Sequence, residues 1–209
     1  MTRPSESVTT GLPPGTRPSC LRRRTGGPRK RESCDDHAGA AGVEGRGSVA
    51  DASEFEFIGA LVVAAYDSIP GAIHDPEYNE TLRNVSERAA VVPVLVAATE
   101  FGVVGTLTYV PGPGPLAELA QTGDAEIRMF AVHPSAQGTG AGSALLDFAI
   151  QMATDDRRRS MVLSTSPWMT AAQALYASRG FVREPQLDRF EDSSGVSFEL
   201  FAYRLTLPR

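Results

Sequence analysis

The chain has 209 residues, of which 42% are hydrophobic and 22% are charged, and its net charge is −5 at pH 7. This length predicts one domain with or without an extension, and the composition excludes both a collagen and a wholly disordered chain. The longest nearly apolar stretch, residues 89–98, is interrupted by Pro93. It is too short to span a bilayer, which takes about 18 or more apolar residues, so we expect no membrane partner. The acidic balance also argues against nucleic acid as the main partner.

The first 50 residues differ from the rest in charge and composition. They hold nine basic and five acidic residues, a net charge of +4 that leaves −9 for the remainder. The segment is rich in Gly, Pro and Ser and has no periodic apolar face, so it cannot bury enough apolar surface to offset the entropy of ordering. We therefore predict a disordered basic extension over residues 1–42 and a folded domain over residues 43–209. Both cysteines, Cys20 and Cys34, lie in the extension, which excludes a cysteine nucleophile from the domain and favours a reducing, cytoplasmic location.

The domain shows helix and strand signals that alternate along the chain. Ser53, with Glu56 three residues later, forms a capping box that predicts a helix through about residue 66. Asp75 followed by Pro76 predicts a second helix, whose apolar stripe runs to about residue 89. Runs rich in Val and Leu predict the strands, and apolar residues at helical spacing predict two more helices. The expected strands are residues 93–99, 103–110, 125–132, 161–166, 181–183 and 197–205, and the expected helices are residues 140–155 and 170–179. This order predicts a mixed α/β fold.

A glycine-rich turn carries the strongest functional signal. Residues 137–142 read Gln-Gly-Thr-Gly-Ala-Gly and lie between an expected strand and an expected helix. Such a turn directs backbone N–H groups outward at the positive end of a helix dipole, so it binds a phosphate group without a lysine. A P-loop is excluded because no lysine follows the glycines. A dinucleotide-binding turn is excluded because its third glycine would fall on Ser143 or Leu145.

The turn and its surroundings resemble the GNAT superfamily of N-acetyltransferases. Residues 137–142 are similar to the family's Gln/Arg-x-x-Gly-x-Gly/Ala pyrophosphate loop, and residues 125–132 resemble the acetyl-CoA strand before it. Residues 172–181, Ala-Gln-Ala-Leu-Tyr-Ala-Ser-Arg-Gly-Phe, resemble the family's Ala-x-x-Leu-Tyr-x-x-x-Gly-Phe segment. Met169 departs from the pattern, because the family often has Asn at this position. The resemblance implies a central, mostly antiparallel sheet that is flanked by helices and has splayed central strands.

The resemblance also implies an activity, which is the transfer of an acetyl group from acetyl-CoA to a primary amine within a ternary complex. Backbone N–H groups of the turn would hold the pyrophosphate of acetyl-CoA. The edge of the strand that ends at Val132 would pair with the pantetheine arm, and an N–H near Val132 would polarise the acetyl carbonyl. The implied cofactor-binding residues are Phe130, Ala131, Val132, Gln137, Gly138, Thr139, Gly140, Ala141, Gly142 and Ser143.

Two roles in the chemical step have candidate residues. Tyr176 would donate a proton to the leaving thiolate, and the alternative is a core aromatic residue. Glu126, acting through water, is the first candidate for the general base that takes a proton from the amine, and Asp188 is the second. The structural alternative for Glu126 is a pairing with Arg128 on the same strand face. Trp168 would line a substrate pocket or pack in the core.

Other functions stay open at this point. One alternative is an acyl-CoA sensor, a domain of the same fold that binds acyl-CoA without turnover. Another is nucleic-acid binding through the basic extension. Three scattered histidines predict no metal site. The acceptor is a small-molecule or peptide amine, and the acidic domain suits a cationic one through long-range steering. The sequence also leaves a homodimer open.

Overall fold

An eight-stranded sheet organises the part of the chain that this computed structural model describes, residues 47–208. The strand order is β1-β2-β3-β4-β5-β8-β6, with β7 paired to β8. The strands are β1 (Ser48–Val49), β2 (Val94–Thr99), β3 (Gly102–Val110), β4 (Asp124–Val132), β5 (Ser160–Thr165), β6 (Val182–Arg183), β7 (Arg189–Ser193) and β8 (Val196–Thr206). β4 and β5 run parallel, whereas the other neighbours are antiparallel. The predicted mixed α/β fold with a mostly antiparallel sheet is confirmed, while the predicted extension over residues 1–42 lies outside the described residues.

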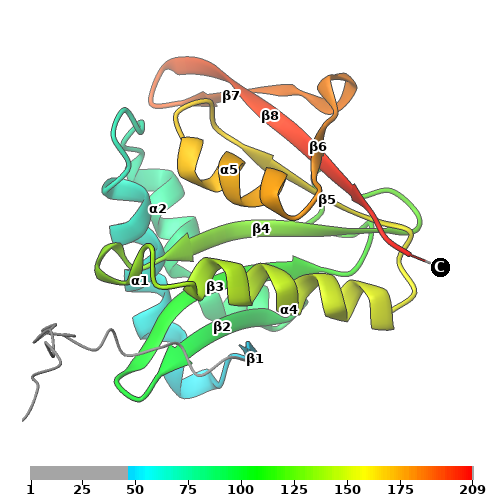
Figure 1. Ribbon diagram of the computed structural model, residues 1–209. Coiled ribbons are helices and arrows are strands. Elements are labelled where there is room, and N and C mark those ends of the chain that lie inside the picture. The colour runs from blue at the N-terminus through cyan, green and yellow to red at the C-terminus, as the bar shows by residue number, and fades with distance from the viewer. Residues whose placement is uncertain (1–46, 209) are drawn as a thin grey trace, which may run out of the picture. The chain divides into compact units, whose positions relative to one another are not determined.

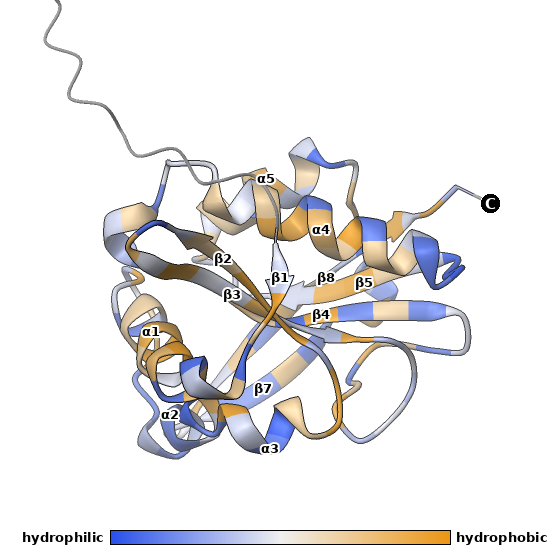
Figure 2. Cartoon of the chain, turned by 90° about the horizontal axis from the view of Figure 1, so that it is seen from below, coloured by the Kyte–Doolittle hydropathy of each residue, from blue (hydrophilic) through white to orange (hydrophobic). Residues whose placement is uncertain are grey.

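Helices cover both faces of the sheet (Figures 1 and 2). One face carries α4 (Ala141–Asp155) and α5 (Thr170–Ser178), and the other carries α1 (Phe55–Asp67), α2 (Pro76–Arg83) and α3 (Val85–Ala89). Because successive side chains of a strand point to opposite faces, neighbouring residues of β2 enter different cores. Leu95 packs into the core on the α4 side, and Val96 packs into the core on the α1 side.

Two helix boundaries differ from the sequence prediction. Asp51, not Ser53, forms the capping box with Glu54, because a short 3-10 helix at Ala52–Glu54 precedes α1. The expected helix over residues 75–89 is broken at Asn84, whose side chain accepts the N–H of Glu87 and caps a separate α3. Asparagine is among the preferred N-cap residues, so its side chain competes with a continuous helix at this point.

The β7–β8 hairpin was missed in part by the sequence prediction. β7 reads Arg-Phe-Glu-Asp-Ser and has no buried residue, so it lacks the apolar run that marks a strand. Its structure comes from antiparallel pairing with β8 over Arg189–Ser193. Along the described part of the chain, no helix is both long enough and apolar enough to cross a membrane.

Candidate active site

Strand β4 separates from β5 in its second half. β4 pairs with β5 only over Asp124–Ile127, and the last residues of β5 pair with β8 alone. Met129 has a φ of 50°, and the register with β3 shifts between Thr106 and Thr108, so β4 contains a β-bulge. The bulge bends β4 at the point where its pairing with β5 ends. The predicted splay of the central strands is thereby confirmed.

Beyond the bulge, β4 presents an open backbone edge. The N–H of His133 donates to the carbonyl of Val104 at 2.8 Å, on the side of β3. Because successive N–H groups of a strand point to opposite sides, the N–H of Val132 points to the side that β5 has left. An open edge of this kind can take an extended ligand chain as an added strand.

The glycine-rich turn presents unpaired backbone donors at the start of α4. Gly138 and Gly140 have φ values of 79° and 95°, in the left-handed region that favours glycine. Within residues 47–208, the N–H groups of Gly138, Gly140, Gly142 and Ser143 have no hydrogen-bond acceptor, and no side chain caps α4. A Cβ atom placed on Gly138 or Gly140 would meet nothing within 4 Å, so the space before these amides is open. The turn therefore fits a pyrophosphate group, whose oxygens accept such hydrogen bonds.

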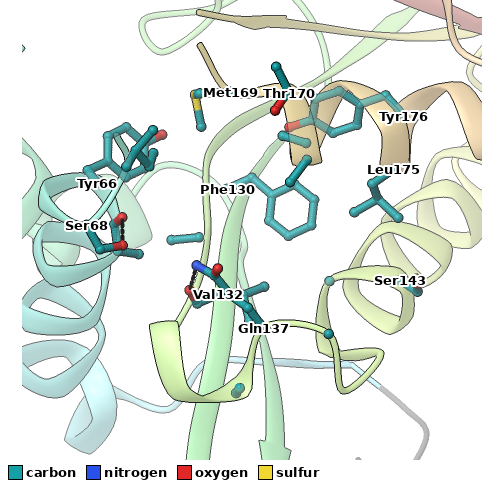
Figure 3. Close-up of a pocket in the computed structure, with 18 of the residues that line it drawn as sticks. Tyr66, Ser68, Phe130, Val132, Gln137, Ser143, Met169, Thr170, Leu175 and Tyr176 are labelled. Carbon is teal, nitrogen blue, oxygen red and sulfur yellow. Dashed lines mark hydrogen bonds between the residues drawn. The ribbon is translucent and has the colours of Figure 1, made fainter. Parts of the chain in front are cut away.

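A cavity of about 490 Å³ joins the open edge of β4 to this turn, and we name it the donor cavity after the role proposed for it below. Figure 3 shows Phe130 and Val132 from β4, Gln137 from the turn, and Leu175 and Tyr176 from α5 around it. Eight of the predicted cofactor-binding residues line the cavity, namely Phe130, Ala131, Val132, Gln137, Gly138, Gly140, Gly142 and Ser143.

Two predicted cofactor-binding residues, Thr139 and Ala141, do not line the donor cavity. The hydroxyl of Thr139 donates to the carbonyl of Ala136 at 2.7 Å, and this hydrogen bond stabilises the conformation of the turn. Ala141 is buried in the core on the α4 side. Their side chains therefore shape the turn, while the residues beside them face the cavity.

Tyr176, the predicted acid, lines the donor cavity from α5. Its ring packs against Phe130, Phe181 and Tyr203, with ring centroids 6.2, 5.9 and 6.1 Å away, and its hydroxyl is directed into the cavity (Figure 3). Burial raises the pKa of the Tyr176 phenol well above its ordinary value. The hydroxyl therefore keeps its proton at neutral pH, and the same shift makes the phenol a weaker acid than an ordinary tyrosine. The sequence left Tyr176 as either a proton donor or a core aromatic residue. In the structure its ring packs in the core and its hydroxyl also faces the cavity.

Glu126, the first candidate for the general base, lies away from the cavity. Its side chain is 1% exposed, and it lines neither the donor cavity nor the smaller cavity described below. Its Oε2 atom accepts the N–H groups of Glu118, Leu119 and Ala120, each at 2.9 Å. The carboxylate thus anchors the loop that precedes β4. This placement does not support the predicted base role through water, because a base must reach the proton that it removes directly or through one water, and Glu126 lines neither cavity.

Substitution of Glu126 by Gln should change stability rather than the chemical step. The neutral amide loses the charge-assisted hydrogen bonds to the loop, and we expect the free energy of unfolding to fall by about 1–3 kcal/mol in a urea titration. We expect kcat to stay within about threefold of the wild-type value. A loss of about a hundredfold in kcat at unchanged stability would return Glu126 to the role of general base.

The carboxylate of Asp188, the second candidate for the base, is also hydrogen-bonded to other groups of the protein. Its two carboxylate oxygens accept hydrogen bonds from Arg183 at 2.5 and 2.7 Å, and Oδ1 also accepts the N–H of Ala202 at 2.7 Å. It lines neither cavity. Hydrogen bonding to Arg183 lowers the pKa of Asp188, which makes it a weaker base than an ordinary aspartate.

A second cavity of about 170 Å³ adjoins the donor cavity, and we name it the acceptor cavity after the role proposed for it below. Both are lined by Tyr66, Ile69, Trp168 and Met169, so they meet beside the gap between β4 and β5. Trp168, which the sequence left between pocket and core, lines both cavities. The remaining walls of the acceptor cavity come from α2, the bulge of β4, the end of β5 and the β7–β8 hairpin.

Glu118 brings charge into the acceptor cavity, and no sequence motif pointed to it. Its carboxylate pairs with both Arg128 and Arg189. Burial raises the pKa of Glu118, and the two guanidinium groups oppose this shift. The pairing of Glu126 with Arg128, which the sequence offered as the alternative to the base role, does not form, because Arg128 donates to the carbonyl of Leu116 and pairs with Glu118 instead.

Comparison with known proteins identifies the family. The model of the acetyltransferase (GNAT) family matches residues 60–181, which is more than half of the chain. No curated protein matches the chain. Among residues 47–208, no group of three or more His, Cys, Asp or Glu side chains could hold a metal ion.

Solved structures share the fold. A GCN5-related N-acetyltransferase from Rhodopseudomonas palustris is 18% identical with a TM-score of 0.60, over 77% of this chain and 94% of that one. The ribosomal-protein-alanine N-acetyltransferase from Brucella melitensis is 23% identical with a TM-score of 0.56, over 77% and 99%. The protein yncA from Salmonella typhimurium, solved with its cofactor acetyl-CoA, is 21% identical with a TM-score of 0.59, over 78% and 94%. The family match includes the glycine-rich turn and Tyr176, and the chain belongs to the acetyltransferase (GNAT) family.

Proposed function

We propose that this chain transfers the acetyl group of acetyl-CoA to a primary amine while both substrates are bound. The proposal depends above all on one observation. The donor cavity combines the open edge of β4, the unpaired amides of the glycine-rich turn and the hydroxyl of Tyr176. Membership of the family supports acetyl transfer in general.

In this proposal the donor cavity holds acetyl-CoA. The pyrophosphate oxygens accept hydrogen bonds from the N–H groups of Gly138, Gly140 and Gly142 at the positive end of α4. The pantetheine arm pairs with the edge of β4 from Phe130 to Val132 as an added strand. The N–H of Val132 then donates to the acetyl carbonyl oxygen, which gains negative charge as the amine attacks.

The acceptor amine enters from the acceptor cavity. After its ammonium group has lost one proton to water, the nitrogen attacks the carbonyl carbon of the thioester. The C–N bond forms and the C–S bond breaks, while the nitrogen releases a second proton to solvent. The thiolate takes the proton of Tyr176, which solvent then restores, and the products are an acetylated amine and free CoA. No cysteine occurs after Cys34, which agrees with transfer that has no acyl-cysteine intermediate.

Turnover separates this enzyme from an acyl-CoA sensor. The full-length chain is incubated with acetyl-CoA and a panel of primary amines, and acetylated products are detected by mass spectrometry. We expect at least one amine to be acetylated at a rate proportional to protein concentration. Tight binding of acetyl-CoA in calorimetry, without acetylation of any amine, would identify a sensor instead.

We assign the catalytic domain to residues 43–209 and regard residues 1–42 as an extension that the activity does not need. Because the extension has no apolar periodicity, its deletion should leave the melting temperature and the Kd of acetyl-CoA unchanged. Thermal unfolding and calorimetry on the shortened chain check this expectation. A fall of many degrees in the melting temperature would show that residues 1–42 stabilise the domain.

A further inference from the structure

The wall that the two cavities share is formed by four residues, Tyr66, Ile69, Trp168 and Met169. An amine that enters from the acceptor cavity passes these residues to reach a thioester in the donor cavity. Neither Glu126 nor Asp188 is among them, so neither predicted base faces the attacking nitrogen there. The shared wall is therefore the place where a protein group can touch the amine as it approaches the thioester.

Tyr66 carries the one hydroxyl group among these four side chains. A neutral amine attacks with its nitrogen lone pair, so a group that orients it has to accept a hydrogen bond from N–H and leave the lone pair free. The indole of Trp168 only donates, the side chain of Ile69 is apolar, and the thioether of Met169 is a weak acceptor. The phenol oxygen of Tyr66 is the strong acceptor in the shared wall.

The ring of Tyr66 is held beside the bulge of β4. Tyr66 lies in the last turn of α1 and packs against a buried cluster. That cluster includes Met129, which lines the acceptor cavity, and Ala131, which lines the donor cavity. The ring also packs against Tyr78, with ring centroids 6.2 Å apart. These contacts fix the ring where the two cavities meet.

The hydroxyl of Tyr66 is free to bind a ligand. It has no hydrogen-bond partner within residues 47–208, and its oxygen is not one of the buried side-chain atoms that lack a partner, so it is open to solvent. Figure 3 shows Tyr66 across the donor cavity from Tyr176, with each hydroxyl directed toward the other. Burial of the ring raises the pKa of the Tyr66 phenol, so the group stays neutral at neutral pH.

We propose that Tyr66 is a catalytic residue that orients the attacking amine. Its phenol oxygen accepts a hydrogen bond from one N–H of the neutral amine, while the nitrogen lone pair faces the carbonyl carbon. As the C–N bond forms, the nitrogen gains positive charge and its N–H becomes a stronger donor, so the hydrogen bond strengthens in the transition state. The proton that the nitrogen then releases still goes to solvent. The inference rests on the proposed function, because it adds a residue to the same reaction.

The variant Tyr66→Phe tests this role, because it removes the hydroxyl and keeps the ring. The full-length chain is assayed with acetyl-CoA and the amine of the panel that is acetylated fastest. We expect kcat to fall about tenfold and KM for the amine to stay within about threefold, since the hydrogen bond is strongest in the transition state. The melting temperature should not fall, because the ring still packs against Tyr78 and the hydroxyl has no partner among the described residues.

Calorimetry tests whether the hydroxyl contacts the amine or the acetyl carbonyl. A hydrogen bond to the carbonyl would favour acetyl-CoA over free CoA, and its loss would raise the Kd of acetyl-CoA alone. We expect Tyr66→Phe to bind acetyl-CoA and free CoA each within about twofold of the wild-type Kd. A Kd raised for acetyl-CoA only would assign the hydroxyl to the carbonyl and overturn its role toward the amine.

Tyr109→Phe is the matched control. Tyr109 lines neither cavity, and its hydroxyl donates to Asp156 at 2.9 Å. This variant should lower the melting temperature, because it loses that hydrogen bond, and it should leave kcat and both Kd values unchanged. The two variants therefore show opposite patterns, one in the kinetics and the other in stability.

The outcomes separate this inference from the proposed function. Wild-type kcat in Tyr66→Phe, together with a slow Tyr176→Phe, would overturn the role of Tyr66 and leave acetyl transfer intact. An equal loss of kcat in Tyr66→Phe and Tyr109→Phe would also overturn it, because the effect would then come from the fold and not from the shared wall. No acetylation of any amine would overturn the proposed function, and the role of Tyr66 with it.

Discussion

Replacement of Tyr176 by Phe should lower kcat at least tenfold, while the Kd of acetyl-CoA changes by less than about threefold. The substitution removes only the hydroxyl, and the ring still packs against Phe130, Phe181 and Tyr203. Because the thiolate takes its proton only as the C–S bond breaks, the loss should be confined to the chemical step. Steady-state kinetics give kcat, and calorimetry gives the Kd.

The melting temperature serves as the control for Tyr176→Phe. It should stay close to the wild-type value, since Phe retains the ring carbon atoms through which Tyr176 contacts its aromatic neighbours. Burial keeps the Tyr176 phenol protonated at neutral pH, so its deprotonation should not limit the rate below pH 10. Wild-type turnover in the Phe variant would make water the proton donor and leave Tyr176 as a core residue.

Replacement of Gly140 by Glu should weaken acetyl-CoA binding by at least tenfold, which corresponds to about 1.4 kcal/mol. Gly140 precedes α4 and has open space before it, so the new carboxylate would extend to where the pyrophosphate is proposed to lie. Repulsion between the two anions, in addition to the lost approach to the amides, should raise the Kd measured by calorimetry.

Gly140→Ala is the matched control for that prediction. Gly140 has a φ of 95°, so any side chain there adds backbone strain, and the Ala and Glu variants share this strain. The charge effect is therefore the difference in Kd between the two variants. If the Ala and Glu variants bound acetyl-CoA equally well, anion repulsion would play no part and the proposed pyrophosphate site would be wrong.

The features that the sequence predicted well are those set by neighbouring residues. The glycine-rich turn lies between a strand and a helix, and each of these elements has its own local signal. Tyr176 was singled out because residues 172–181 resemble a short segment of the family, and the structure places it in the wall of the donor cavity. Local patterns of this kind survive folding because they depend on backbone conformation within a few residues.

The features that the sequence did not predict depend on contacts between distant segments. Glu126 was predicted to act as a base or to pair with Arg128, but the loop that precedes β4 folds back and donates three N–H groups to it. The same loop brings Glu118 to Arg189, which lies 71 positions away in the sequence.

The β7–β8 hairpin has a consequence for how substrate preference can change. It contributes Arg189, Glu191, Asp192, Ser193, Phe198 and Leu200 to the acceptor cavity and nothing to the donor cavity. β7 pairs with β8 alone and lies off the main path of the sheet, and its contacts beyond β8 include side-chain bonds of Arg189 to Glu118 and of Ser193 to Asp75. Under the proposed function, exchange of this hairpin for one of different charge should redirect the chain to another amine while the proposed acetyl-CoA site stays intact. Recognition of the two proposed substrates would then reside in separate parts of the fold, free to diverge at different rates.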